Sequence, residues 1–299
     1  MPQTNFSLND DLELALRLAD AADAITRDRF LSLDLEVMTK PDKTPVTDAD
    51  RAVEQVIIDM LAAERGDDFM LGEEFGEQPG RVADHPVGAS DHPHRQWIID
   101  PIDGTSNFLR GVPVWATLIA LAVDGEPVVG VVSAPALGKR WWATKGNGAW
   151  VDESRDALSQ VAIPDALAGL LGEPMSADSE PRRLHVSAVN ELADASISYN
   201  SLQQWDQAGY LDELVGFSRR VWRTRAYGDM WSYMMVAEGI LDVAGEFDLK
   251  PYDMAALMPI VREAGGTFTS VEGHPDCWHG SALATNGILH HIVLDALKK

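Results

Sequence analysis

The hydrophobic pattern of this chain changes character part-way along its length, and this change limits the folds open to it. Between residues 115 and 143, short apolar runs rich in β-forming residues are separated by turn signals, and Asp124-Gly125 is typical of a hairpin. From about residue 184 onward, strand-like and helix-like segments alternate. We therefore expect an α/β protein, with an α+β first half built on an antiparallel sheet and an α/β second half.

The first half is expected to open with two amphipathic helices. Apolar residues recur at helical spacing over 12–25, where Asn9 or Asp10 would cap the helix. They recur again over 53–61, in a helix that begins near Thr47. Short strands at 69–71 and 96–99 should each end directly before acidic residues.

The second half is expected to alternate between strands and helices. The strands are expected at 184–186, 196–199, 220–224, 241–245, 267–271 and 281–285, and the helices at 205–217, 229–239, 253–264 and the C-terminus. Because the pattern is weakest over 152–181, we place the boundary there, between a first half of 1–155 and a second half of 156–299.

Acidic residues outnumber basic ones by 47 to 24, which gives a formal net charge of −23. Such a chain is unsuited to bind nucleic acid or anionic lipid. Its negative charge is explained either by binding of cations, such as metal ions or positively charged small molecules, or simply by a role in solubility. The longest apolar runs, such as 115–123, are too short to span a bilayer. The first eleven residues lack the basic and apolar regions of a signal peptide, so we expect a cytoplasmic protein.

Cysteine and histidine do not indicate a transition-metal site. Cys277 is the one cysteine of the chain, so a multi-cysteine site is excluded and we expect an inert thiol. The eight histidines lack the spacing of zinc ligands, and we expect them to be solvated.

The strongest chemical signal is an apolar strand that ends in two carboxylates, Asp100 and Asp103. Carboxylate and carbonyl oxygens are the ligands that Mg²⁺ prefers, so Asp100, the Ile102 carbonyl and Asp103 are candidate ligands. The Gly104-Thr105-Ser106 turn follows, and backbone amides at such a turn suit a phosphate anion. Simple turn formation by the two aspartates is the alternative explanation.

Further acidic residues lie near other predicted element ends. Glu73 and Glu74 also follow a strand, and several carboxylates buried together without a cation would be costly. Asp50 lies three residues after Thr47, which is also typical of a capping box. Asp253 begins a helix, where the helix dipole favours a carboxylate whatever its function.

Four segments, residues 44–50, 72–74, 100–105 and 253–266, resemble in order and spacing the inositol monophosphatase-like superfamily of metal-dependent phosphomonoesterases. The resemblance spans nearly the whole chain. It implies a layered αβαβα sandwich, dimeric in most members, with the active site between the two halves. Tyr252 departs from the pattern, because many members carry Trp before the aspartate.

The resemblance also implies a role for each matching residue. The ligands of two or three Mg²⁺ ions would be Glu73, Asp100, the Ile102 carbonyl, Asp103 and Asp253. Asp50 and Thr105, with Glu73, would orient and deprotonate the attacking water, and Gly104, Thr105 and Ser106 would hold the phosphate. The first half would bind the metal, and the second would contribute Asp253 and the substrate wall to one catalytic unit.

Residues 111–117 and 223–239 are most similar to the histidinol-phosphate phosphatases of this superfamily. This implies that L-histidinol phosphate is the substrate, in histidine biosynthesis. Its ammonium and imidazole groups would be attracted by Asp229 and Glu246, and Trp115 would pack on its ring. Arg225 is a further candidate in the substrate wall. Asp229 is equally explained as a helix cap after Gly228, and the role of Glu246 is just as open.

Two other functions compete with this one. The same chemistry on inositol 1-phosphate or a related sugar phosphate is the first. The second is a regulator that binds metal on a phosphatase scaffold without catalysis, which the retention of all the candidate acidic residues disfavours.

Overall fold

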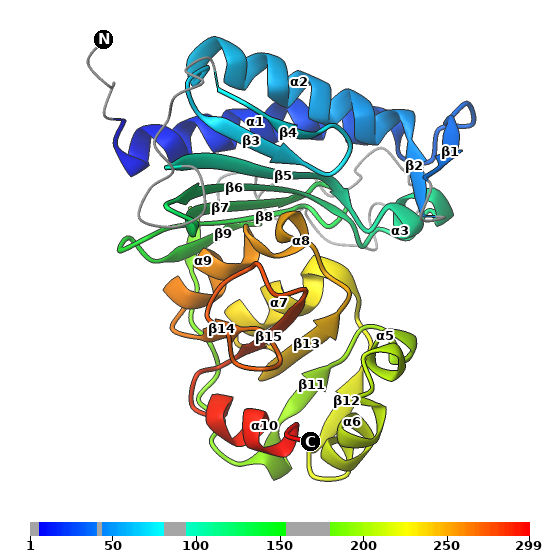
Figure 1. Ribbon diagram of the computed structural model, residues 1–299, viewed down its shortest axis with the longest axis vertical. Coiled ribbons are helices and arrows are strands. Elements are labelled where there is room, and N and C mark those ends of the chain that lie inside the picture. The colour runs from blue at the N-terminus through cyan, green and yellow to red at the C-terminus, as the bar shows by residue number, and fades with distance from the viewer. Residues whose placement is uncertain (1–5, 41–43, 81–93, 154–179) are drawn as a thin grey trace, which may run out of the picture.

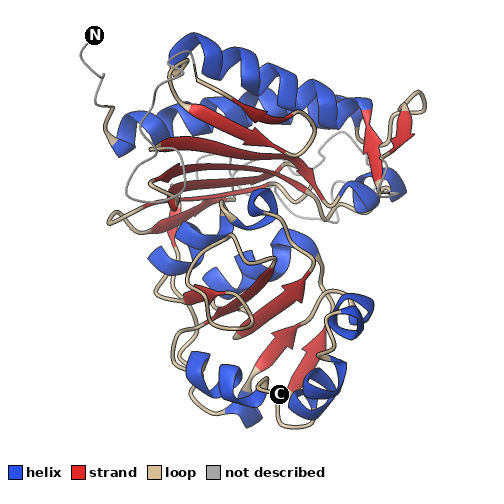
Figure 2. Cartoon of the chain, in the orientation of Figure 1, coloured by secondary structure: helices blue, strands red, loops and turns tan. Residues whose placement is uncertain are grey.

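A computed structural model describes residues 6–40, 44–80, 94–153 and 180–299. Its helices and sheets form five alternating layers, the αβαβα arrangement that the resemblance implies (Figures 1 and 2). The expected domain boundary at 155/156 and most of the weakly patterned segment around it lie outside the described residues.

The first half supplies the first two layers. Two long helices, α1 (Leu8–Arg29) and α2 (Asp48–Glu64), cover one face of an eight-stranded sheet (Figure 1). The spatial order of that sheet is β10 (Arg182–Arg183), β9 (Ala149–Asp152), β8 (Lys139–Thr144), β7 (Glu126–Ala134), β6 (Ala116–Val123), β5 (Arg95–Asp103), β3 (Phe69–Gly72) and β4 (Gly76–Gln78). A hairpin of β1 (Val37–Thr39) and β2 (Pro45–Thr47) and the short helix α3 (Thr105–Arg110) flank it.

The second half supplies the other three layers. The middle helices are α7 (Asp229–Ala237), α8 (Pro251–Met254) and α9 (Leu257–Glu263). The second sheet has the order β12 (Arg223–Arg225), β11 (Ser196–Ser198), β13 (Val243–Phe247), β15 (Ser281–Thr285) and β14 (Thr267–Thr269). The last layer contains α5 (Leu202–Gln207), α6 (Leu211–Ser218) and α10 (His290–Ala296), and a 3₁₀ turn covers Leu192–Asp194.

Both long helices begin with a capping box. The hydroxyl of Ser7 accepts the Asp10 amide while the Asp10 carboxylate accepts the Ser7 amide, so the expected cap at Asn9 or Asp10 is wrong by two or three residues. In α2, Thr47 and Asp50 form the same reciprocal pair, as the sequence predicts. The start of α2 therefore fixes the position of Asp50.

The antiparallel part of the first sheet confirms the strand predictions for its middle. β5 to β9 pair antiparallel in chain order, and the β6–β7 turn is Asp124-Gly125, both with positive φ. β3 pairs parallel with β5, so the C-terminal ends of these two strands lie at the same edge of the sheet. Acidic residues that follow the two strands are thereby brought close together.

The second half differs from its prediction at several places. The expected helix at 205–217 is divided between α5 and α6 by a turn at Gly209, whose φ is +76°, and the expected helix at 253–264 is divided between α8 and α9. The strand expected at 184–186 is instead Arg182–Arg183, and it joins the first sheet through β9. One strand of the first sheet therefore comes from beyond residue 156.

A continuous apolar core joins the halves, because side chains from β5 to β9 and from α7, α8 and α9 form one buried cluster. His290 is also buried, between the hydroxyls of Thr269 and Thr285, so the expectation of solvated histidines is wrong there. Among the described residues, no helix combines the length and apolar character needed to cross a bilayer.

Candidate active site

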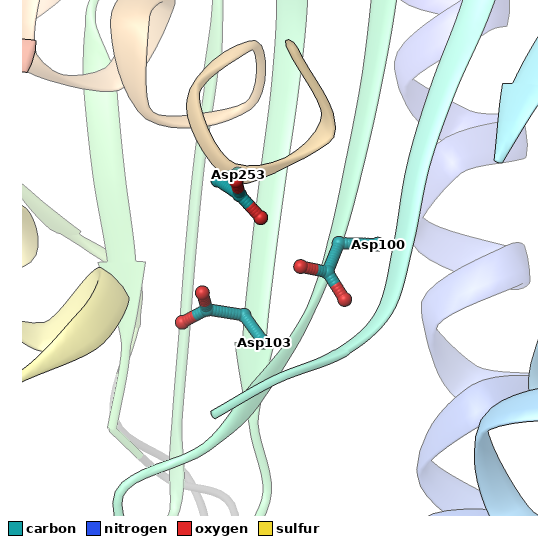
Figure 3. Close-up of side chains that lie close together, drawn as sticks. All are labelled: Asp100, Asp103 and Asp253. Carbon is teal, nitrogen blue, oxygen red and sulfur yellow. The ribbon is translucent and has the colours of Figure 1, made fainter. Parts of the chain in front are cut away.

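Three carboxylates converge between the first sheet and the middle helices. Asp100 and Asp103 come from β5 and Asp253 from α8, and one oxygen of each lies within 4.8 Å of the others (Figure 3). In Figure 3 the carboxylates of Asp100 and Asp253 point into the space between the three residues, and that of Asp103 lies at its side. Asp100 is almost fully buried.

A bulge in β5 lets two aspartates three residues apart serve the same site. In a regular strand, residues separated by three point to opposite faces of the sheet. Here Asp100 pairs with Leu118 and Asp103 with Ala116, so β5 has one residue more than β6 over this stretch. Pro101 lies in the extra stretch, and its carbonyl accepts a hydrogen bond from the Thr117 hydroxyl.

Glu73 and Glu74 follow β3, and Glu73 lies close enough to Asp100 for its charge to raise the pKa of Asp100. The ammonium group of Lys40 contacts both, at 2.8 Å from Glu73 Oε1 and 2.5 Å from Glu74 Oε1. Burial opposes the charge of Lys40, but the two ion pairs prevail and raise its pKa. Lys40 was not predicted from the sequence, because nothing local to its loop indicates that β1 and β2 bring it to Glu73.

The expected water-orienting pair is also in contact. The Thr105 hydroxyl lies 3.0 Å from the Ile102 carbonyl oxygen and 3.3 Å from Asp50 Oδ1, and it can donate a hydrogen bond to either oxygen. The other Asp50 oxygen, Oδ2, accepts the amide and hydroxyl of Thr47. Asp50 therefore acts as a helix-start residue and as a partner of Thr105, and burial raises its pKa.

The Gly104-Thr105-Ser106 turn forms the start of α3. Gly104 precedes the helix with a φ of +84°, and Thr105 and Ser106 are its first two residues. Amide groups in the first turn of a helix have no partner within it, so they are available to an anion. A Cβ at Gly104 would lie 2.9 Å from the Val114 carbonyl oxygen, which explains the glycine.

Asp229 and Glu246 extend the acidic region on the side of the second half. Burial raises the pKa of Asp229 to about 6, and burial together with the charges of Asp229 and Asp253 raises that of Glu246 well above its usual value. Gly228 is the N-cap of α7, so the alternative that Asp229 is the cap is wrong. The carboxylate of Asp229 instead accepts a hydrogen bond from the Asn107 side chain at 2.6 Å.

Two residues expected in the substrate wall do not lie in the acidic cluster. Trp115 is fully buried and packs between Phe30 and Phe108, with ring centroids 5.2 and 4.9 Å away. It has no free face for a substrate, so the prediction that its ring packs on the substrate is wrong. Arg225 is exposed on the edge strand β12, where its guanidinium donates to the Thr224 carbonyl.

Glu54 supports the turn that carries Glu73 and Glu74, and the sequence analysis missed it. It lies on α2, fully buried, and its two oxygens accept the amides of Glu74 and Phe75 at 2.8 and 2.9 Å. A Cβ at Gly72 would lie 1.9 Å from Glu54 Oε1, so only glycine fits there. The one sequence signal for this role is the position of Glu54 on the inner face of α2, because a buried glutamate needs a polar partner.

Replacing Glu54 by Leu is expected to lower the free energy of unfolding by about 2–5 kcal/mol, because two partly buried amides lose their acceptor. It should also weaken the binding of a divalent cation at the carboxylate cluster, since the turn holding Glu73 is released. Urea unfolding and calorimetric titration with a divalent cation measure the two effects. The control is Glu64→Leu on the same helix, where a partly exposed ion pair with Arg17 is lost and less than about 1 kcal/mol should change. Equal effects of the two substitutions would contradict the role of Glu54.

The donor atoms of the cluster suit a hard divalent cation. They are all oxygens, and among the described residues no histidine or cysteine belongs to the group. Burial raises the pKa of Asp253 to about 7, and burial with the charge of Glu73 raises that of Asp100 well above its usual value. Ionising these groups together is therefore unfavourable unless a cation compensates them.

Comparisons with known proteins agree with this geometry. The family model described as the inositol monophosphatase family matches residues 8–298. The histidinol-phosphatase of Mycobacterium tuberculosis is 50% identical over 291 residues, which cover 97% of this chain and 98% of that protein. The histidinol-phosphatase of Streptomyces coelicolor is 50% identical over 294 residues, or 97% of each chain. An inositol monophosphatase structure from Zymomonas mobilis superposes with a TM-score of 0.75 at 28% identity, covering 98% of this chain and 99% of that one.

Proposed function

Since the chain belongs to the inositol monophosphatase family, we propose that it is a Mg²⁺-dependent phosphomonoesterase that hydrolyses L-histidinol phosphate to L-histidinol and phosphate. One observation carries the proposal: the carboxylate cluster of Asp100, Asp103 and Asp253 continues into a second acidic pair, Asp229 and Glu246. The names of the two relatives at 50% identity support the substrate.

Glu73, Asp100, the Ile102 carbonyl, Asp103 and Asp253 would hold the metal, as two or three Mg²⁺ ions. Bound Mg²⁺ would supply positive charge to the phosphate and the leaving oxygen, and would lower the pKa of the attacking water. The amides of the Gly104-Thr105-Ser106 turn would bind the phosphate oxygens that face α3.

Asp50 and Thr105 would handle the proton of the attacking water. A hydroxyl that donates its own proton to a carboxylate can accept one from water, so the Thr105 hydroxyl would pass a proton to Asp50 Oδ1. Burial raises the pKa of Asp50, which makes it a better base than an exposed aspartate. The water oxygen then bonds to phosphorus as the bond between phosphorus and the ester oxygen breaks, and the alkoxide that leaves takes up a proton from solvent, to which Asp50 returns the one it received.

Asp229 and Glu246 would select the alcohol portion of the substrate. Histidinol carries an ammonium group and an imidazole that can be protonated, and both are attracted to buried carboxylates. Inositol is a neutral polyol and gains no such attraction. The expected difference between the two esters therefore depends on charge at this acidic pair.

The proposal is tested by phosphate release from purified protein with Mg²⁺, on histidinol phosphate and inositol 1-phosphate at equal concentration. We expect at least about a tenfold higher kcat/KM on histidinol phosphate, since one charge-assisted interaction is worth about 1.5–3 kcal/mol. A chelator should abolish release from both esters, because the carboxylate cluster loses its cation. Preference for the inositol ester would agree with the assigned metal site but contradict histidinol phosphate as the substrate. Release from neither ester would favour the alternative function, a regulator that binds metal without catalysis.

We further propose that the protein is a homodimer in the cytoplasm, and the dimer is what the resemblance to the family implies. Size-exclusion chromatography with light scattering measures the oligomeric state.

A further inference from the structure

The side-chain amide of Asn107 connects the two halves at the acidic pair. Asn107 lies on α3 in the first half, and its Nδ2 donates to the Val114 carbonyl at 2.9 Å and to Asp229 Oδ2 at 2.6 Å. Both N–H groups of this amide are therefore used, one to fix the amide to its own half and one to hold Asp229.

Asp229 is held in an uncommon backbone conformation. Its φ is +43°, a region that few residues other than glycine adopt and that is found where the surroundings enforce it. Gly228 before it has a φ of +95°, and the next amide, that of Met230, donates to Asp103 Oδ2 at 2.8 Å. The first turn of α7 is thus fixed to the first half through the backbone at Met230 and the side chain at Asp229.

The glycine at 104 makes room for this arrangement. A Cβ there would lie 3.1 Å from Asp229 Oδ2, closer than side chains ordinarily approach. The same carboxylate oxygen that accepts Asn107 therefore lies against the backbone of the phosphate turn. Oδ2 is thus held by the protein, and no hydrogen bond engages Oδ1 among the residues that the structure describes.

We infer that Asn107 is a positioning residue that holds Asp229 Oδ2 and so presents Oδ1 to the ammonium group of the substrate. It determines specificity through Asp229 and makes no contact with the reacting phosphate. This inference rests on the proposed function, because an ester without a cationic group gains nothing from the orientation of that oxygen. Asn107 contributes to discrimination between esters and not to hydrolysis itself.

The test uses Asn107→Leu, which keeps the branched shape of the side chain and removes both donated hydrogen bonds. Phosphate release is measured with Mg²⁺ on histidinol phosphate and on p-nitrophenyl phosphate, which has neither an ammonium nor a hydroxyl group. We expect the ratio of kcat/KM on the two esters to fall about tenfold or more, mainly through KM for histidinol phosphate. The ratio should be insensitive to Asn107→Leu when Asp229→Ala is already present.

The matched control is Asn286→Leu. Asn286 also donates both N–H groups, to the Ser187 hydroxyl and the Val189 carbonyl, away from the acidic cluster. It should leave the ratio unchanged whatever it does to stability. If Asn107→Leu does not fold, Asn107→Ser gives the same comparison with a smaller polar side chain.

The possible failures are distinguishable. Failure of the proposed function appears in the unsubstituted protein alone, as no preference for histidinol phosphate over p-nitrophenyl phosphate. Failure of the inference leaves that preference in place, and Asn107→Leu then lowers activity on both esters equally or acts just as strongly in the Asp229→Ala background. Either result would assign Asn107 a purely structural role.

Discussion

Replacing Asp103 by Asn is expected to lower phosphate release from any ester by at least about 10³-fold, which corresponds to about 4 kcal/mol of transition-state stabilisation. Asn keeps a carbonyl oxygen that can accept the Met230 amide, so the start of α7 should stay in place. What is lost is one of the three converging negative charges. Phosphate release at saturating Mg²⁺ and calorimetric titration of Mg²⁺ measure the loss of activity and of metal affinity.

The control for this substitution is Asp124→Asn in the β6–β7 turn, where Asn also tolerates positive φ and activity should be unchanged. In the presence of a chelator, Asp103→Asn should be at least as stable as the unsubstituted protein, because it removes a carboxyl group whose ionisation is opposed by burial and by the charges of Asp229 and Asp253. Unchanged activity in Asp103→Asn would contradict the assignment of the metal site.

Local pattern was enough to predict most of the sheet that carries the site. The runs at 115–123 and 128–134 became β6 and β7 with the expected turn, and 281–285 became β15 without a shift. The helix at 205–217 was less predictable, because a periodic pattern does not record where two short helices change direction at Gly209. The strand expected at 184–186 was displaced to Arg182–Arg183, because its position depends on pairing with β9, which precedes a long segment of the chain.

The acidic residues at the ends of β3 and β5 were predictable because these two strands end at one sheet edge, whereas Asp253, on α8, was assigned by the resemblance. The contacts that orient them were not, since they join residues distant in sequence: Lys40 with Glu73, Glu54 with the amide of Glu74, and Asn107 with Asp229. Trp115 shows the opposite error. An aromatic residue near a site is as readily a buried support as a binding surface, and only packing against Phe30 and Phe108 distinguishes the two.

Removing divalent metal is expected to make the free energy of unfolding fall as the pH rises from about 5 to 8. Burial raises the pKa of Asp253 to about 7 and that of Asp229 to about 6. A carboxyl group with a higher pKa in the folded state binds more protons when folded, so its contribution to stability is present at low pH and is lost as the pH rises through the folded value.

Urea unfolding with a chelator, at several pH values between 5 and 8, measures this slope. Exposed carboxylates with ordinary pKa values are already ionised over that range, so the net charge of −23 contributes little to it. Saturating Mg²⁺ should remove the slope, because a cation stabilises the ionised form of the cluster, and Asp253→Asn should reduce it without metal. His290, whose pKa burial lowers to about 4, adds an opposing slope, so the diagnostic quantity is the change that Asp253→Asn makes. If Asp253→Asn leaves the slope of the chelated protein unchanged, the carboxyl group of Asp253 is not destabilised by its burial and does not require a cation.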